Sequence, residues 1–187
     1  MTPRSTDTDP RPDLLSLPRG EAEAALAAHF RARGQGGYRV RQALAWIYER
    51  DVARFEEMTD LPKAERGALA EAFRLTPCEA AQVSRSTDGT VKHLWRLTDG
   101  ELVESVLIPT EDRLTLCISS QAGCAMACVF CATGWSGYRR QLTPGEIVAQ
   151  LRGARRWARE NAEGWSGAAG MGPAGHEITT IVFMGMG

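Results

Sequence analysis

Three cysteines stand within eight residues, Cys124, Cys128 and Cys131, in the arrangement Cys-x3-Cys-x2-Cys. Three thiolates from one short segment are one ligand too few for a closed structural zinc site, which takes four. On a [4Fe–4S] cluster, three thiolates leave one iron without a protein ligand. S-adenosylmethionine can chelate that iron through its amino and carboxylate groups, and electron transfer into its sulfonium releases a 5′-deoxyadenosyl radical. The spacing therefore favours radical chemistry with these two cofactors.

The same cysteines allow simpler interpretations. A zinc ion, or packing without any metal, stays open as an alternative. Cys117 lies seven residues before Cys124, but inside a predicted strand, so its use as a further ligand requires distortion. With Cys78 the cysteines number five, an odd number, and in a reducing compartment the clustered three suggest metal or redox chemistry rather than a disulfide frame. Phe130 stands where an aromatic ring can shield a cluster.

Composition limits the class of protein. The chain has 187 residues, a net charge of −1 and 43% hydrophobic residues, so it can build a core and is not disordered throughout. No apolar run approaches the roughly 20 residues of a membrane-spanning helix. Residues 1–17 are polar and proline-rich, without the apolar core of a signal peptide. We therefore expect a cytoplasmic protein with no membrane partner.

The N-terminal part is predicted to be helical. A flexible tail is expected over residues 1–19, followed by a helical accessory domain over residues 20–80. Apolar spacing, glycines and capping residues place its helices at 21–33, 38–52 and 61–74. Asp60 is the predicted N-cap of the third helix.

Arginine dominates the positive charge, with 20 Arg against two Lys. Six of these arginines lie between Arg31 and Arg54, where the acidic residues are only Glu49 and Asp51. Because arginine binds phosphates and stacks on bases, the helical domain is predicted to dock RNA. A solvated helix face explains the same pattern without any partner.

Two Asp-Gly pairs organise the middle of the chain. Strand-like runs at 82–87, 91–98 and 101–108 are joined by Asp88-Gly89 and Asp99-Gly100. This dipeptide favours tight hairpin turns, because both central positions require a positive φ. An antiparallel β meander is therefore predicted over residues 81–112.

Residues 113–187 carry a β/α pattern. A buried strand at 114–119 precedes the cysteines, and Thr143 with Glu146 forms a capping box at the start of a helix. That helix is expected to separate apolar residues from arginines, with Ile147, Leu151, Ala154 and Ala158 on one face and Arg152, Arg155, Arg156 and Arg159 largely on the other. A glycine-rich loop at 161–175 and a buried strand at 178–184 complete a βαβ unit.

The cysteine segment resembles the radical-SAM adenine-C2 methyltransferases of 23S rRNA. The resemblance covers roughly residues 20–187 and is carried by the segments 38–42, 103–109, 117–134, 138–147 and 182–187. It implies an α/β fold in which a small helical domain and the meander precede a partial radical-SAM (β/α) barrel. The implied cofactors are a [4Fe–4S] cluster on the three cysteines and S-adenosylmethionine.

The resemblance also implies roles for single residues. Adenine C2 is electron-poor and accepts a carbon radical, which the family generates on a methylated cysteine near its C-terminus. By motif position Cys117 is the thiol that resolves the resulting protein–RNA adduct, and Glu104 removes the C2 proton. Gly185, Met186 and Gly187 match the start of a motif that receives the amino end of S-adenosylmethionine. Each role has a simpler alternative. Cys117 can be an ordinary buried cysteine, Glu104 a solvent-facing carboxylate on a strand, and the Gly-Met-Gly segment a plain turn.

The sequence departs from the family pattern in two ways. No cysteine follows Cys131, and two barrel strands are predicted where a radical-SAM barrel uses about six. The chain is therefore expected to be an N-terminal fragment that does not turn over alone. The implied partners are 23S rRNA, tRNA and a flavodoxin-type electron donor, and a monomer is expected. The alternatives are an adenine-C8 methyltransferase of the same superfamily and a non-catalytic RNA-binding fragment.

Overall fold

The computed structural model describes residues 9–110, 113–162, 165 and 177–187. They form two compact units, one from Asp9 to Pro77 and one from Cys78 to Gly187. Within this described part of the chain, no helix is both long and apolar enough to cross a membrane.

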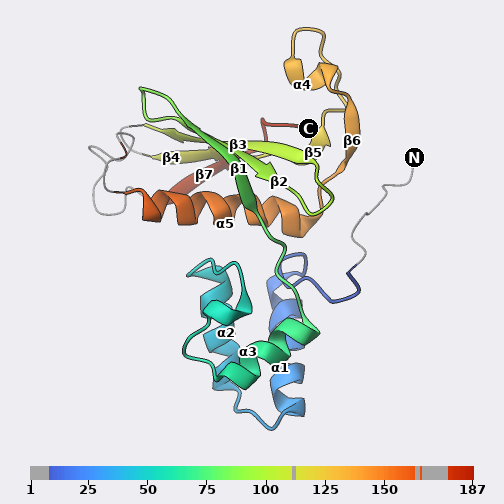
Figure 1. Ribbon diagram of the computed structural model, residues 1–187, viewed down its shortest axis with the longest axis vertical. Helices are drawn as coiled ribbons and strands as arrows, with labels where there is room; N and C mark the ends of the chain where they lie inside the picture. Colours follow the sequence, from blue (N-terminus) through green and yellow to red (C-terminus); the bar gives the residue numbers. More distant parts are fainter. Residues whose placement is uncertain (1–8, 111–112, 163–164, 166–176) are drawn as a thin grey trace. The chain divides into compact units, whose positions relative to one another are not determined.

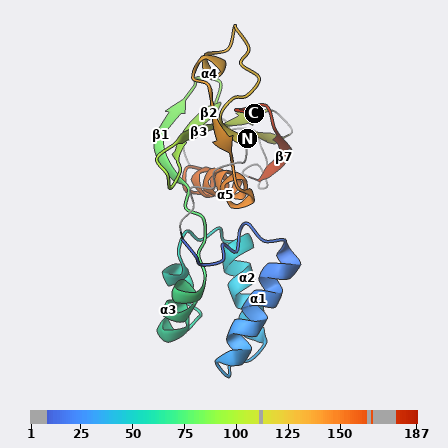
Figure 2. The same cartoon turned by 90° about the vertical axis from the view of Figure 1, so that its right-hand side faces the viewer.

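The first unit is helical. It contains α1 (Arg19–Ala32), α2 (Tyr38–Tyr48), the 3-10 helix η1 (Phe55–Glu57) and α3 (Lys63–Ala72). Helices α1 and α2 pack side by side (Figure 2). The core is built by apolar residues of α1 and α2 together with residues of α3 and of the segment before it, and its fully buried side chains include Leu26, Phe30, Ile47, Met58, Leu61 and Leu69. The predicted helix over 38–52 ends early, since Asp51 adopts a left-handed backbone with φ of 54°.

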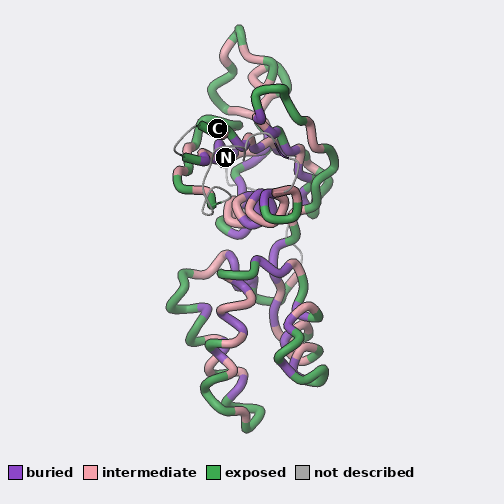
Figure 3. Tube along the Cα trace, turned by 90° about the vertical axis from the view of Figure 1, so that its left-hand side faces the viewer, coloured by how far each residue is buried: buried purple, intermediate pink, exposed green. Residues whose placement is uncertain are grey.

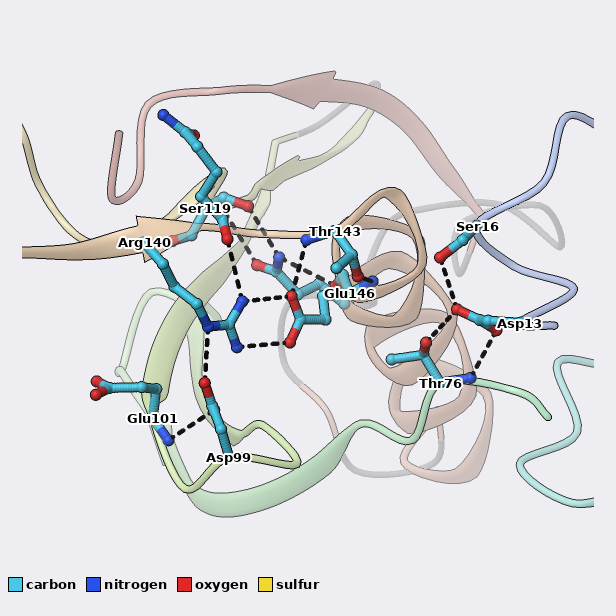
Figure 4. Close-up of polar contacts among 11 residues, drawn as sticks. Asp13, Ser16, Thr76, Asp99, Glu101, Ser119, Arg140, Thr143 and Glu146 are labelled. Carbon is cyan, nitrogen blue, oxygen red and sulfur yellow. Dashed lines mark hydrogen bonds and ion pairs between the residues drawn. The ribbon is translucent and has the colours of Figure 1, made fainter. Parts of the chain in front are cut away.

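The segment before α1 corrects the expectation of a flexible tail up to residue 19. Leu14 and Leu15 are buried in the helical unit, and Asp13 is 5% exposed. Asp13 accepts hydrogen bonds from the Thr76 backbone N–H at 3.1 Å, from the Thr76 hydroxyl, and from the Ser16 hydroxyl at 2.7 Å (Figure 4). The two leucines and this buried carboxylate fix residues 9–18. Residues 1–8 lie outside the described residues.

Asp60 is not the N-cap of α3. The helix follows Pro62, which has no side-chain capping bond. The Asp60 carboxylate instead accepts from the Trp46 indole N–H at 2.5 Å and from the Gln42 amide at 3.4 Å. Its acceptor capacity is therefore used across the helical unit rather than at the start of a helix.

The second unit is built on a five-stranded sheet in the order β1-β2-β3-β4-β7. The strands are β1 (Glu79–Arg85), β2 (Val91–Arg96), β3 (Leu102–Pro109), β4 (Leu114–Cys117) and β7 (Ile178–Val182). As predicted, β1, β2 and β3 form an antiparallel meander joined by the two Asp-Gly turns. Strand β4 pairs antiparallel with β3 and parallel with β7. The meander and the βαβ unit therefore share one sheet with both antiparallel and parallel strand pairs, and this sheet is not a closed barrel (Figure 1).

Helix α5 (Pro144–Glu160) covers one face of this sheet (Figure 1). The predicted capping box is present, because the Glu146 N–H donates to Thr143 Oγ1 at 3.2 Å and the Thr143 N–H donates to the Glu146 carboxylate at 2.8 Å. Buried residues lie between helix and strands, and they include Val91, Trp95, Val103, Leu107, Leu116, Ala154 and Ala158 (Figure 3).

Arg152 departs from the predicted separation of apolar and basic faces. It is 7% exposed, whereas Arg159 is exposed as expected. The buried part of α5 extends beyond its aliphatic residues, because Gln150, Arg152 and Gly153 are also buried. Most of the predicted loop at 161–175 lies outside the described residues.

Candidate active site

The three clustered cysteines lie on a hairpin that leaves the sheet after β4. Strands β5 (Gln121–Gly123) and β6 (Tyr138–Gln141) pair antiparallel, and the segment between them contains the short helix α4 (Ala132–Trp135). Residues 121–141 are called the cysteine hairpin below, and Figure 1 shows them projecting from the sheet. Four large apolar side chains between its two strands are strongly exposed, namely Met126, Val129, Phe130 and Trp135.

Backbone contacts shape the loop around the thiols. The Cys131 N–H donates to the Cys128 carbonyl at 3.0 Å, and the Cys124 N–H donates to the Gly137 carbonyl at 3.3 Å. Gly134 packs so closely that a Cβ there would lie 2.8 Å from the Cys128 carbonyl oxygen. The loop therefore requires glycine at this position.

The thiols of Cys124, Cys128 and Cys131 are half-buried, and none forms a disulfide. Backbone N–H groups of Gly134 and then Thr133 lower the pKa of the Cys131 thiol, which favours the thiolate that binds metals. Across the described residues, however, no three His, Cys, Asp or Glu side chains lie close enough together to hold a metal ion. The structure thus places the three sulfurs on one accessible loop without gathering them into a ligand set.

This donor set fits an iron–sulfur cluster in its chemistry. Three thiols on one loop, partly open to solvent, supply the ligands that such a cluster takes. Cys78 is different, since burial raises the pKa of its thiol and keeps it protonated. Cys78 therefore belongs to the packing of the sheet unit and not to the candidate ligands.

Glu104 and Cys117 lie on the same face of the sheet. Val106 on β3 stands directly opposite Cys117 on β4, and Glu104 is two residues before Val106. Residues two apart on a strand share a face. This is the face turned away from α5, because the alternate residues Val103 and Leu116 point into the core under that helix. The Glu104 carboxylate is paired with the Lys92 ammonium at 3.0 Å, whereas Cys117 is buried.

The Gly185–Gly187 segment is bonded to the start of the cysteine hairpin. The Met186 N–H donates to the Ser119 hydroxyl at 3.0 Å, and the Met186 carbonyl accepts from the N–H groups of Ser120 and Gln121 at 2.9 Å each. Gly185 lies so near β4 that a Cβ would stand 2.9 Å from the Ile118 carbonyl oxygen. Glycine is therefore needed here for close packing of two backbones.

A hollow of about 670 Å³ brings several of these parts together. Its lining includes Lys92, Glu104, Ala132, Thr133, Arg139 and Met186. The candidate base, the Gly-Met-Gly segment and the residues directly after Cys131 thus face one space. Cys117, Gly185 and Gly187 are not among its lining residues.

A solved structure with the same arrangement defines the class of this fold. The crystal structure of a radical SAM methyltransferase from Sphaerobacter thermophilus superposes with a TM-score of 0.76 and 40% sequence identity. The match covers 94% of this chain and 47% of that chain. The fold is that of the radical-SAM methyltransferases, of which this chain shows the helical unit and part of the sheet.

Sequence comparison narrows the class to one family. Residues 14–75 match the family described as the ribosomal RNA large subunit methyltransferase N-terminal domain. Proteins called dual-specificity RNA methyltransferase RlmN, or probable dual-specificity RNA methyltransferase RlmN, are similar over nearly the whole chain. One from Anaeromyxobacter sp. is 49% identical over 96% of this chain, and one from Gemmatimonas aurantiaca is 46% identical over 94%. The chain belongs to the RlmN family, and it spans less than half the length of these relatives, 44% and 45%.

Other residues of the site could not be found from the sequence. Arg140 is 8% exposed and ion-paired, whereas the neighbouring Arg139 is exposed and lines the hollow. Lys92 lies beside Glu104 only because β2 pairs with β3. Gln150 and Ser119 are fully buried and hydrogen-bonded to each other, and no local spacing links them.

Proposed function

We propose that this chain forms part of an enzyme that methylates C2 of an adenosine in 23S rRNA and in tRNA. The names of its relatives support the RNA methyltransferase class. The observation that carries the proposal is the shared hollow, which joins Glu104, Met186 and the residues following Cys131. A base, a binding segment and the candidate cluster loop around one space are the parts that radical methylation of a base requires.

Cys124, Cys128 and Cys131 are the proposed ligands of a [4Fe–4S] cluster. When bound, the cluster and S-adenosylmethionine supply the radical that starts the reaction. Gly185, Met186 and Gly187 are proposed to receive the amino end of S-adenosylmethionine. Their backbone is held at this edge of the sheet by Ser119 and by the N–H groups that open β5. These residues bind and orient, and the redox chemistry belongs to the cofactors.

Glu104 is the proposed base that removes the C2 proton of the adenine. Its carboxylate is 36% exposed, lines the hollow and lies 3.0 Å from the Lys92 ammonium, so it stands where a general base could reach a bound adenine. Cys117 is the proposed resolving thiol, on the same sheet face as Glu104. A thiol there acts after the carbon bond to the base has formed, when the bond between protein and RNA must be broken.

RNA docking is proposed for the helical unit. Arg31 and Arg41 are exposed, and Arg50 stacks on the Trp46 ring at 3.9 Å with its charge still at the surface. Arg33 is less available, because its guanidinium makes two hydrogen bonds to the Glu65 carboxylate, at 2.9 and 3.0 Å. We further propose a cytoplasmic monomer that receives electrons from a flavodoxin-type donor.

The test uses a full-length protein that joins this chain to the remaining C-terminal part of the Anaeromyxobacter relative. After anaerobic loading with iron and sulfide, it is incubated with S-adenosylmethionine, a reductant and 23S rRNA or tRNA transcripts. Mass spectrometry of the digested RNA should detect 2-methyladenosine, and Glu104→Gln should abolish it while S-adenosylmethionine cleavage persists. A product methylated at C8, or no methylated adenosine from a cluster-loaded protein, contradicts the proposal.

A further inference from the structure

Arg140 is a buried cation where the cysteine hairpin returns to the sheet. Its side chain is 9% exposed. Nη1 and Nη2 donate to the two carboxylate oxygens of Glu146 at 2.8 Å each, and Nε donates to Asp99 Oδ2 at 2.7 Å (Figure 4). These bonds raise the pKa of the guanidinium, with Glu146 the larger influence, so the charge is permanent.

The two carboxylates come from different parts of the unit. Glu146 belongs to the first turn of α5. Asp99 belongs to the turn that joins β2 to β3, and the lining of the hollow includes Asp99, Gly100, Glu101 and Leu102 from this part of the sheet. The lining also includes Ala132, Thr133, Gly137 and Arg139 of the cysteine hairpin. The Asp99–Arg140 pair therefore ties together these two parts of the lining, which are the two walls of the hollow.

Neutralising Arg140 does not require Asp99. The bidentate contact with Glu146 already provides a full countercharge and two charge-assisted hydrogen bonds. Asp99 adds a second anion whose side chain is only 13% exposed, and such an anion is costly to bury unless it is paired. Asp99 links the β2–β3 turn to β6, two segments that are far apart along the chain.

The two oxygens of Asp99 have separate tasks. Oδ1 accepts from the Glu101 N–H at 3.1 Å within the turn, and Oδ2 accepts from Arg140. The other Asp-Gly turn provides a comparison within the same sheet. There Asp88 Oδ1 accepts from the Thr90 N–H at 2.9 Å, but Oδ2 accepts from the Thr90 hydroxyl at 3.1 Å. Asp88 thus makes the same turn contact and directs its second oxygen back into the turn.

We propose that Asp99 and Arg140 are positioning residues that hold the cysteine hairpin against the Glu104 side of the hollow. Their pairing fixes the separation between the thiol-bearing loop and the carboxylate of Glu104. Neither residue needs to touch a reacting atom. The inference rests on the proposed function, because positioning has a purpose only if the two walls serve one reaction.

Three variants distinguish the Asp99–Arg140 ion pair, called the clamp below, from the contact that Asp99 makes within its own turn. Asp99→Asn keeps the acceptor for Glu101 but removes the anion at Arg140, whereas Asp99→Glu keeps the anion but lengthens the side chain. Asp88→Asn is the matched control in the other hairpin. Hydrogen exchange on this chain should be about tenfold faster at residues 121–141 in Asp99→Asn. It should be nearer to wild type in Asp99→Glu and unchanged in Asp88→Asn, with β2 and β3 equally protected in all.

Activity in the full-length joined protein distinguishes positioning from stability alone. Asp99→Asn should still cleave S-adenosylmethionine, while methylated adenosine formed per 5′-deoxyadenosine falls about tenfold. Asp99→Glu should recover part of this ratio. The inference is wrong if Asp99→Asn has the wild-type hydrogen-exchange rate at residues 121–141 and also forms the wild-type amount of methylated adenosine per 5′-deoxyadenosine. It is also wrong if exchange becomes faster but the amount of methylated adenosine per 5′-deoxyadenosine does not change. If the wild-type protein makes no methylated adenosine although it cleaves S-adenosylmethionine, the proposed function fails. The exchange result then still decides whether the clamp exists.

Discussion

The side-chain amide of Gln150 pairs with both backbone groups of Ser119. Its Oε1 accepts from the Ser119 N–H at 3.0 Å, and its Nε2 donates to the Ser119 carbonyl at 2.9 Å. Both residues are fully buried. The Ser119 hydroxyl in turn donates to the Glu104 carbonyl at 2.7 Å and accepts from the Met186 N–H. Helix α5 is thereby bonded to the point where β4 gives way to the cysteine hairpin.

Replacing Gln150 with Leu should destabilise the sheet unit. The change keeps the volume but leaves two buried backbone groups of Ser119 without partners, which costs about 2–4 kcal/mol. Urea denaturation should report that loss as a lower midpoint with an unchanged slope. Gln141→Leu, at an exposed position of β6, is the control and should change the free energy of unfolding by less than about 0.5 kcal/mol. Equal stability of both variants would mean that the Gln150 contacts contribute nothing.

Local chemistry decided which elements could be predicted. The Asp-Gly pairs and the capping box at Thr143 act within a few residues, and the two hairpins and the helix start formed as expected. The turn geometry was predicted wrongly, because only Gly89 and Gly100 have a positive φ, whereas Asp88 and Asp99 do not. Strand β3 belongs to the predicted meander and β4 to the predicted β/α region, and no local sequence signal indicates that the two strands pair. The same holds for the site. The cysteines were found by their spacing, whereas Arg140 resembles any surface arginine until Asp99 and Glu146 are brought around it.

Each clustered cysteine should be required for the iron–sulfur cluster. Changing Cys124, Cys128 or Cys131 to Ala removes one of three thiolates, and two are too few to hold a cubane. Anaerobic reconstitution followed by Mössbauer and EPR spectroscopy should show a [4Fe–4S] signal in the wild-type chain and its loss in each variant. Cys78→Ala should retain the signal, since that thiol is buried away from the loop. Stoichiometric zinc binding without any cubane would contradict the assignment.

RNA binding by the helical unit should weaken as salt rises. Each phosphate contact releases counterions, so the logarithm of the affinity falls linearly with the logarithm of salt concentration. Changing Arg31 and Arg41 together to Gln should reduce that slope by about 1–2, measured by fluorescence anisotropy with an rRNA hairpin. Lys63→Gln removes an exposed cation outside the basic segment and should leave the slope unchanged. An affinity that is flat between low and moderate salt would leave these arginines as a solvated face.

His93 should make the sheet unit less stable in acid. Burial lowers its pKa to about 4, and the ring stacks on Trp95 at 4.8 Å between ring centres. The unfolded chain binds a proton near pH 6.5 and the folded chain only near pH 4, so stability is lost as pH falls through this window. The loss between pH 7 and pH 5 should be about 2 kcal/mol. Urea unfolding followed by tryptophan fluorescence measures the free energy of unfolding at each pH. The loss of about 2 kcal/mol should vanish in His93→Phe, whereas His29→Gln should retain it.

Cys117 should be needed only after the carbon bond to the adenine has formed. It lies in β4 on the face that also carries Glu104, seven residues before Cys124, and it is not one of the three proposed cluster ligands. In the full-length joined protein, Cys117→Ala should therefore keep the cluster and S-adenosylmethionine cleavage while RNA stays covalently attached. Denaturing gels with labelled RNA should show this adduct as a slowly migrating band. A buried cysteine with a packing role alone behaves differently, because its loss lowers stability and accumulates no adduct. If the variant releases methylated adenosine at the wild-type rate without such a band, Cys117 has no part in the reaction.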